Sequence, residues 1–161
     1  MSLQEFLKNQ PEDTLESIAV KYNTTVIDVI RQLPSHVLTT GDHFDEVWNN
    51  VADWGEVLLL VHTDDIIAEF TGKLPSGFHR HDYFNLRGKK GISGHIKTKN
   101  CAHIALIERQ FMGVDTASVL FLNNAGNVMF KIFVGRDEHR KLLSGQLSTF
   151  RSLADDFASD C

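Results

Sequence analysis

The spacing of apolar residues changes near residue 35, and the change divides the chain into two parts. Before it, apolar positions recur three and four residues apart, as in Leu15, Ile18 and Ala19. This spacing gives a helix one apolar face. Thr14 stands where a helix N-cap is expected, and Pro34 ends the last run. Residues 1–34 are therefore predicted to form a cap of three short helices.

From about residue 36 apolar residues recur at every second position, the period of a strand. HVLTT reads as a first strand, and DHFDEVWNNVADW as a helix. HTDD and NNAG, each between two apolar runs, indicate hairpins. The pattern predicts a curved antiparallel meander. Its seven further strands are EVLLLVH, DIIAEF, HDYFNLR, GISGHIK, CAHIALIER, ASVLFLN and GNVMFKIFV.

The last segment, RDEHRKLLSGQLSTFRSLADDF, has apolar residues at helical spacing. Asp137 and Glu138 would suit the N-terminal dipole of a helix that begins there. This helix is expected to lie across one face of the sheet. Because CAHIALIER and NVMFKIFV are apolar on both faces, the other face needs a second cover, either a flat apolar ligand or another subunit.

These patterns predict an α+β fold in which residues 1–161 form a single domain. Residues 1–34 are the helical N-terminal cap, and residues 35–161 are a curved antiparallel β-sheet with helices. A chain of 161 residues with 42% apolar residues can bury a substantial core.

Charge and composition exclude several classes of protein. A net charge of -5 argues against general affinity for nucleic acid. The helical start has three Lys/Arg against five Asp/Glu, unlike a DNA-reading helix unit. Cys101 and Cys161 are too far apart in sequence to suggest a disulfide framework. The start MSLQEFLKNQ lacks the pattern of a signal peptide, and no apolar run could span a bilayer. We therefore expect a cytoplasmic protein without nucleic-acid or membrane partners.

The candidate chemistry is concentrated in four histidines: His62, His79, His81 and His95. Histidine within an apolar sheet is costly without a partner, so four in one region predict a ligand that binds imidazole nitrogens. Haem iron is commonly held by neutral imidazole in a mostly apolar pocket. His62 would lie at a rim of the sheet, and Gly94 beside His95 would let a broad ring approach the backbone. The structural alternative is that each is a strand-end histidine bonded to backbone.

The stretch HIALIERQFMGVDTASVLFLNNAGNVMFKIFVGRDEHR resembles the HutX/ChuX family of intracellular haem-utilisation proteins, single-repeat relatives of HemS/ChuS. TLESIAVKYNTTVIDVIRQLP, LPSGFHRHDYFNLRG and SGHIK carry the same resemblance. It implies a HemS/ChuX-like fold, a homodimer joined through its sheets and haem b as the ligand, with His62 and His95 contacting it. It further implies a carrier that passes imported haem to a downstream haem-using or haem-degrading protein.

The segment FHRH allows two interpretations. In the first, it is a solvated loop. In the second, it covers the edge of a bound haem, and Phe78, Tyr83 and Phe84 stack on the ring. Arg80 or Arg87 would then meet a propionate, because guanidinium suits carboxylates.

Tyr83 is also an alternative axial ligand through its oxygen. His79 and His81 would lie on one side of a strand, but no further Cys or His completes a zinc site. A haem-degrading enzyme and a haem-responsive regulator are the alternative functions. The sequence shows no flavin motif for the former.

Overall fold

The N-terminal cap is helical, as predicted. The structure is a computed structural model and describes residues 1–159. The Thr14 hydroxyl accepts a hydrogen bond from the Ser17 amide at 3.1 Å, which satisfies a free donor in the first turn. The cap consists of α1 (Leu3–Lys8), α2 (Leu15–Lys21) and α3 (Val26–Arg31).

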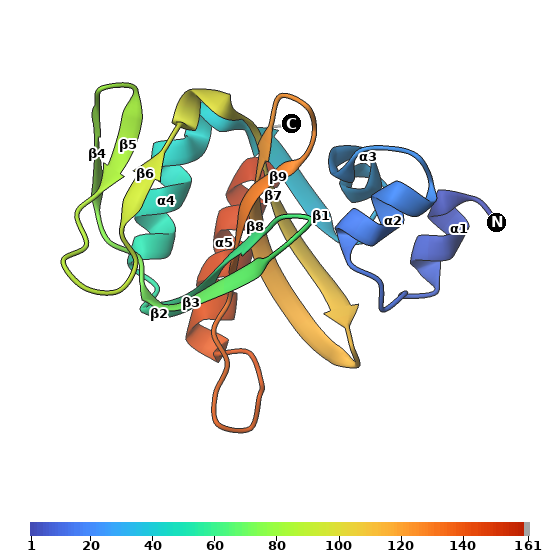
Figure 1. Cartoon of the computed structure of the whole chain (residues 1–161). Helices are drawn as coiled ribbons and strands as arrows, with labels where there is room; N and C mark the ends of the chain where they lie inside the picture. The colour runs from blue at the N-terminus through green and yellow to red at the C-terminus, as the bar shows by residue number, and fades with distance from the viewer. Residues whose placement is uncertain (160–161) are drawn as a thin grey trace.

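Six antiparallel strands form the central sheet, in the order β1-β7-β8-β9-β2-β3 (Figure 1). Only β7 to β9 follow one another as a meander. β1 flanks these three strands on one side and the β2–β3 hairpin flanks them on the other. The strand order of the simple meander predicted from the sequence is therefore wrong. The strands are β1 (His36–Thr40), β2 (Glu56–His62), β3 (Ile67–Lys73), β7 (Cys101–Phe111), β8 (Val114–Asn123) and β9 (Val128–Phe133).

A second, three-stranded sheet holds β4 (Gly77–Arg80), β5 (Tyr83–Leu86) and β6 (Gly94–Ile96). The segment HDYFNLR was predicted as one strand, but His81 and Asp82 both have positive φ, 56° and 68°. Two such residues make the tight turn that joins β4 to β5. FHRH is therefore mostly strand rather than solvated loop, and His81 lies in the turn instead of beside His79.

Two helices, α4 (Phe44–Ala52) and α5 (Ser144–Ala158), pack on one face of the large sheet and enclose the main core. The last helix begins at Ser144, later than predicted. The Asp137 carboxylate accepts hydrogen bonds from the amides of His139 (2.8 Å) and Lys141 (3.0 Å). Aspartate thus closes a local turn in competition with the helix.

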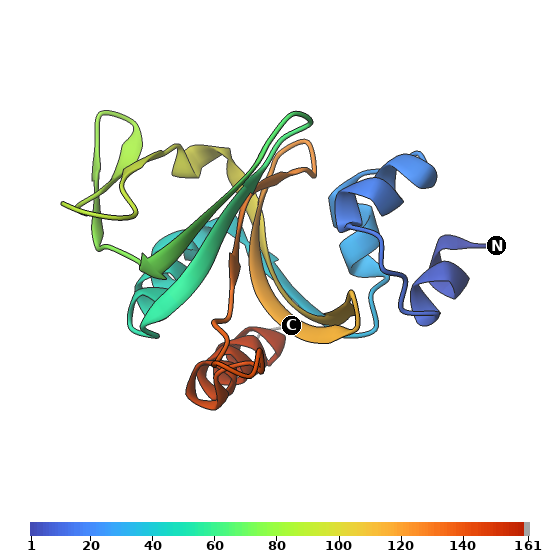
Figure 2. The same cartoon turned by 60° about the horizontal axis from the view of Figure 1, so that its bottom comes forward.

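The opposite face is covered in part by the chain's own cap (Figure 2). Apolar residues of α1 to α3 pack on four residues of β7 and β8, namely Ala105, Ile107, Leu120 and Leu122. No residue of β2 or β3 belongs to this apolar cluster, and an open pocket lies on this part of the face, between the cap and the two strands. Among the described residues, no helix is both long and apolar enough to cross a membrane.

Candidate functional site

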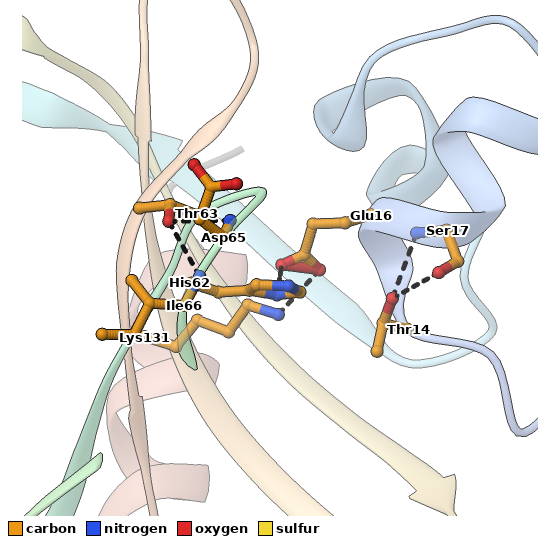
Figure 3. Close-up of polar contacts among 8 residues, drawn as sticks. All are labelled: Thr14, Glu16, Ser17, His62, Thr63, Asp65, Ile66 and Lys131. Carbon is orange, nitrogen blue, oxygen red and sulfur yellow. Dashed lines mark hydrogen bonds and ion pairs between the residues drawn. The ribbon is translucent and has the colours of Figure 1, made fainter. Parts of the chain in front are cut away.

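His62, the last residue of β2, lies between the sheet and the cap (Figure 3). Its Nδ1 lies 2.9 Å from Glu16 Oε2. The other oxygen of Glu16 accepts a hydrogen bond from Lys131 Nζ at 2.8 Å. One carboxylate of α2 therefore binds a histidine of β2 and a lysine of β9, while Nε2 of His62 makes no hydrogen bond with the described residues.

The local fold fixes this arrangement. Side chains alternate along β2, so Leu60 and His62 face the cap, and Leu60 pairs with Lys131 of β9. The turn after His62 is held by the Thr63 hydroxyl, which accepts hydrogen bonds from the amides of Asp65 and Ile66, each at 3.2 Å (Figure 3). A firm turn keeps the end of β2 in place, and with it the imidazole.

The Glu16 carboxylate is held ionised by its neighbours. Burial by itself raises the pKa of Glu16. The charge and hydrogen bond of Lys131, a backbone hydrogen bond and the nearby His62 act in the opposite direction, and the net pKa is lowered. The side chain of Lys131 is only 9% exposed, so Glu16 is its compensating charge.

An open pocket lies beside His62 on the same face. Its cavity volume is about 210 Å³, below the roughly 300–1,000 Å³ typical of small-molecule sites. Its polar lining includes Lys131 and Arg109, and Arg109 donates to the carbonyls of Pro11 and Asp13 at 2.9 and 3.0 Å. Lys131 is already paired with Glu16 and the lining also holds Glu69, so Arg109 is the cation that could meet a carboxylate of an apolar ligand here. The apolar lining includes Leu15, Leu60, Ile67, Phe111, Leu120 and Phe133.

His95 belongs to a different cluster, on the outer face of the small sheet. Phe78, Asn85 and His95 are neighbours in register across the three strands. Nδ1 of His95 lies 2.6 Å from Asn85 Oδ1. The Asn85 amide nitrogen donates to the carbonyls of Phe78, Arg80 and Tyr83 at 3.3, 3.0 and 3.1 Å. These bonds fix the amide, so its oxygen accepts from His95 Nδ1–H, and Nε2 keeps its lone pair.

The other predicted cofactor residues accompany His95. The ring of Tyr83 meets that of His95 edge-on, with centroids 5.8 Å apart. The guanidinium of Arg87 lies 4.5 Å from the centroid of Phe78. Arg80 pairs with Tyr83, and its Nε donates to the His81 ring at 3.1 Å. Five of the six predicted residues are thus brought together.

His62 and His95 are not brought together within one chain. His62 faces the cap side of β2, whereas the groove beside His95 is lined by Leu59 and Val61, which face the opposite side. A sheet therefore separates the two imidazoles. Phe84 is buried in the core rather than available for stacking.

His79 and His81 do not lie together as a pair. Nε2 of His79 lies 2.9 Å from both oxygens of Asp45 on α4, and His81 lies in the turn. Among residues 1–159, no group of three or more His, Cys, Asp or Glu is arranged to hold a metal ion.

Glu16, Asn85 and Lys131 are not among the site residues predicted from the sequence. Glu16 is 46 positions from His62, so no motif spacing links them. Asn85 is two residues from Tyr83 along β5, so the strand period alone could have placed both side chains on one face. Its bond to His95 depends on the register between strands, which the sequence does not show.

Comparisons with known proteins agree on one family. The profile described as haem utilisation ChuX/HutX matches residues 37–153. A protein described as intracellular heme transport protein HutX, from Vibrio cholerae serotype O1, is 30% identical over 152 residues, covering 92% of this chain and 79% of the relative.

Solved structures add to this similarity. One described as ChuX is 62% identical with a TM-score of 0.95, and 99% of each chain is covered. Another, described as the heme binding protein ChuX, is 60% identical with a TM-score of 0.92, covering 98% of this chain and 99% of the other. The E. coli heme oxygenase ChuS is 10% identical with a TM-score of 0.77, covering 95% of this chain and 49% of ChuS, and shares the fold alone.

Proposed function

Since the chain belongs to the ChuX/HutX family of haem utilisation proteins, we propose that it binds haem b in the cytoplasm and carries it to a downstream haem-using or haem-degrading protein. The observation that carries the proposal is the state of the two histidines. Each has its Nδ1 engaged, by Glu16 or by Asn85, and an Nε2 without a hydrogen bond to the described residues. Metal-ligating imidazoles are typically held in this way.

The residues fit haem in distinct roles. His62 and His95 would supply the imidazoles for iron, and Tyr83 beside His95 is the alternative oxygen ligand. Arg80 and Arg87 would meet propionates in the small-sheet cluster. Phe78 would stack on the ring. Bound haem would supply the iron that the proposed carrier transports.

Haem titration tests this function. The purified chain should shift the Soret band and saturate near one haem per chain, or one per two chains if ligands are shared. His62→Ala or His95→Ala should weaken binding by more than about 10-fold, because even changes to groups behind a ligand cost 10–100-fold. His139→Ala is the matched control, since its side chain is 74% exposed beside Glu138. Equal effects of all three variants, or none, would contradict the assignment.

We also propose that the chain is a homodimer. His62 and His95 open to opposite faces of the sheet, so one iron can meet both only if they come from two chains. The edge strand β3 supports association, because Ile67 and Phe70 are 55% and 47% exposed. Exposed apolar edges favour pairing with another chain.

Sedimentation of the protein without haem checks this assembly. The mass should be about twice the 18.2 kDa of one chain. Phe70→Glu should give a monomer, because a charge at an apolar interface is costly. Val20→Glu, at an exposed position on the cap (81% exposed), should leave the dimer intact. A monomeric wild-type chain at micromolar concentration would rule the dimer out.

Haem degradation, the alternative function, has no observation of its own in its favour. A relative 30% identical is described as a transport protein, and a solved structure 60% identical as a binding protein. The likeness to the heme oxygenase ChuS concerns the fold alone. Haem supplied with a reductant and oxygen should therefore persist with the protein, and catalytic loss of its absorption band would overturn this part of the proposal.

A further inference from the structure

We propose that Glu16 of the helical cap is the positioning residue for His62, selecting the tautomer that presents Nε2 to iron. The inference rests on the proposed function, with His62 as a ligand. It adds a residue that lies outside the segment matched by the family profile, residues 37–153.

The geometry of the carboxylate carries the inference. Glu16 Oε1 is bound to Lys131 Nζ at 2.8 Å, which leaves Oε2 for His62 Nδ1 at 2.9 Å. A carboxylate accepts and an ammonium donates, so Lys131 fixes the carboxylate and the carboxylate requires the proton on Nδ1. Nε2 of a neutral His62 then carries a lone pair.

The partner of His62 differs in kind from that of His95. His95 Nδ1 is held by the neutral amide of Asn85, whereas His62 Nδ1 is held by an anion. A carboxylate partner raises the basicity of a ligating imidazole. His62 should therefore bind ferric iron more strongly than an imidazole held by a neutral acceptor.

The arrangement also couples the cap to the site. Glu16 is on α2, while His62 and Lys131 are on β2 and β9 (Figure 3). The tautomer of His62 therefore depends on the docking of a helix that is remote in sequence.

The first experiment uses the protein without haem. The two-bond ¹H–¹⁵N spectrum of the His62 ring, recorded at pH 8, should show the Nδ1–H tautomer. Glu16→Gln should raise the Nε2–H population, because a side-chain amide can donate as well as accept. Glu5→Gln is the matched control: it removes the same charge from the cap, and Glu5 has no side-chain contact with the sheet among the described interactions. An Nε2–H tautomer in the wild-type chain would overturn the proposal.

The second experiment separates positioning from docking of the cap. Glu16→Gln should weaken haem binding by about 10- to 100-fold and lower the Fe–His stretching frequency of the ferrous complex, whereas Glu5→Gln should do neither. In the His62→Ala background, Glu16→Gln should have no further effect on haem affinity. An equal loss in both backgrounds would mean that Glu16 acts only by holding the cap, and would refute the positioning role.

Two further outcomes are distinguishable. If the wild-type chain shows no Soret shift on haem titration, the proposed function fails, while the tautomer measurement still decides what Glu16 does to His62. If the Glu16→Gln protein does not fold, Lys131→Met is the second variant. It keeps the Glu16 carboxylate but removes the ammonium group that holds it. The Nδ1–H population should then fall relative to the wild type, and an unchanged spectrum would refute the role of the Lys131–Glu16 pair.

Discussion

Gly41→Ala is expected to lower the stability of the fold by more than about 3 kcal/mol, beyond the usual cost of overpacking. A Cβ at this position would lie 1.8 Å from the Cys101 carbonyl oxygen and 2.6 Å from its carbon. Both are backbone atoms at the start of β7, so the clash cannot be relieved by rotating a side chain. At roughly 2–4 °C per kcal/mol for a chain of this size, the loss is readily measured as a drop in Tm.

Gly72→Ala is the matched control for this substitution. Gly72 lies in β3, and nothing lies within 4 Å of a Cβ built there. Alanine in a strand is less costly than glycine, so Tm should stay the same or rise slightly. If the Gly41→Ala and Gly72→Ala proteins have the same Tm, the contact of Gly41, which follows β1, with the start of β7 yields more easily than the structure implies.

Phe121→Ala is expected to cost about 3–5 kcal/mol of unfolding free energy, the range for large aromatic residues in cores. Phe121 is fully buried and stacks on Phe130, with ring centroids 4.3 Å apart. It also contacts Phe44 of α4, with centroids 5.2 Å apart. Truncation would open a cavity between the sheet and its helices, because the surrounding rings relax only in part.

Urea denaturation measures this loss, with Phe78→Ala as the comparison at an exposed position. Phe78 is 36% exposed, so its truncation should cost less than about 1 kcal/mol. A Phe121→Ala protein as stable as Phe78→Ala would show that the aromatic cluster is not the centre of the core.

Local patterns predicted most elements of the fold, because helix and strand periods are properties of neighbouring residues. The errors arose where local chemistry was ambiguous. His81 and Asp82 adopt positive φ without the glycine that would have marked a turn. Asp137 and Glu138 are equally compatible with a helix start and with a loop. Only the hydrogen bonds accepted by the Asp137 carboxylate show that the segment is a loop.

The candidate site was predictable only within short segments. Phe78, Tyr83 and His95 lie on one face because adjacent strands pair in register, and the sequence already placed them in one region. The separation of His62 from His95 depends on which way β2 faces in a sheet assembled from distant strands. The contact of Glu16 with His62 depends on the cap docking there, and neither relation is encoded in spacing.

The strand order also bears on how the chain is made. β2 pairs with β3 on one side and with β9 on the other. During synthesis the pairing with β9 can form only after β9 has been made. His62 ends β2 and Val128 begins β9, so 65 residues lie between the two strands along the chain. At ~5–20 residues per second of synthesis, one side of the apolar β2 stays unpaired for roughly 3–13 s. A ribosome that pauses between β3 and β9 would prolong this exposure, and the unpaired edge could then join a neighbouring nascent chain.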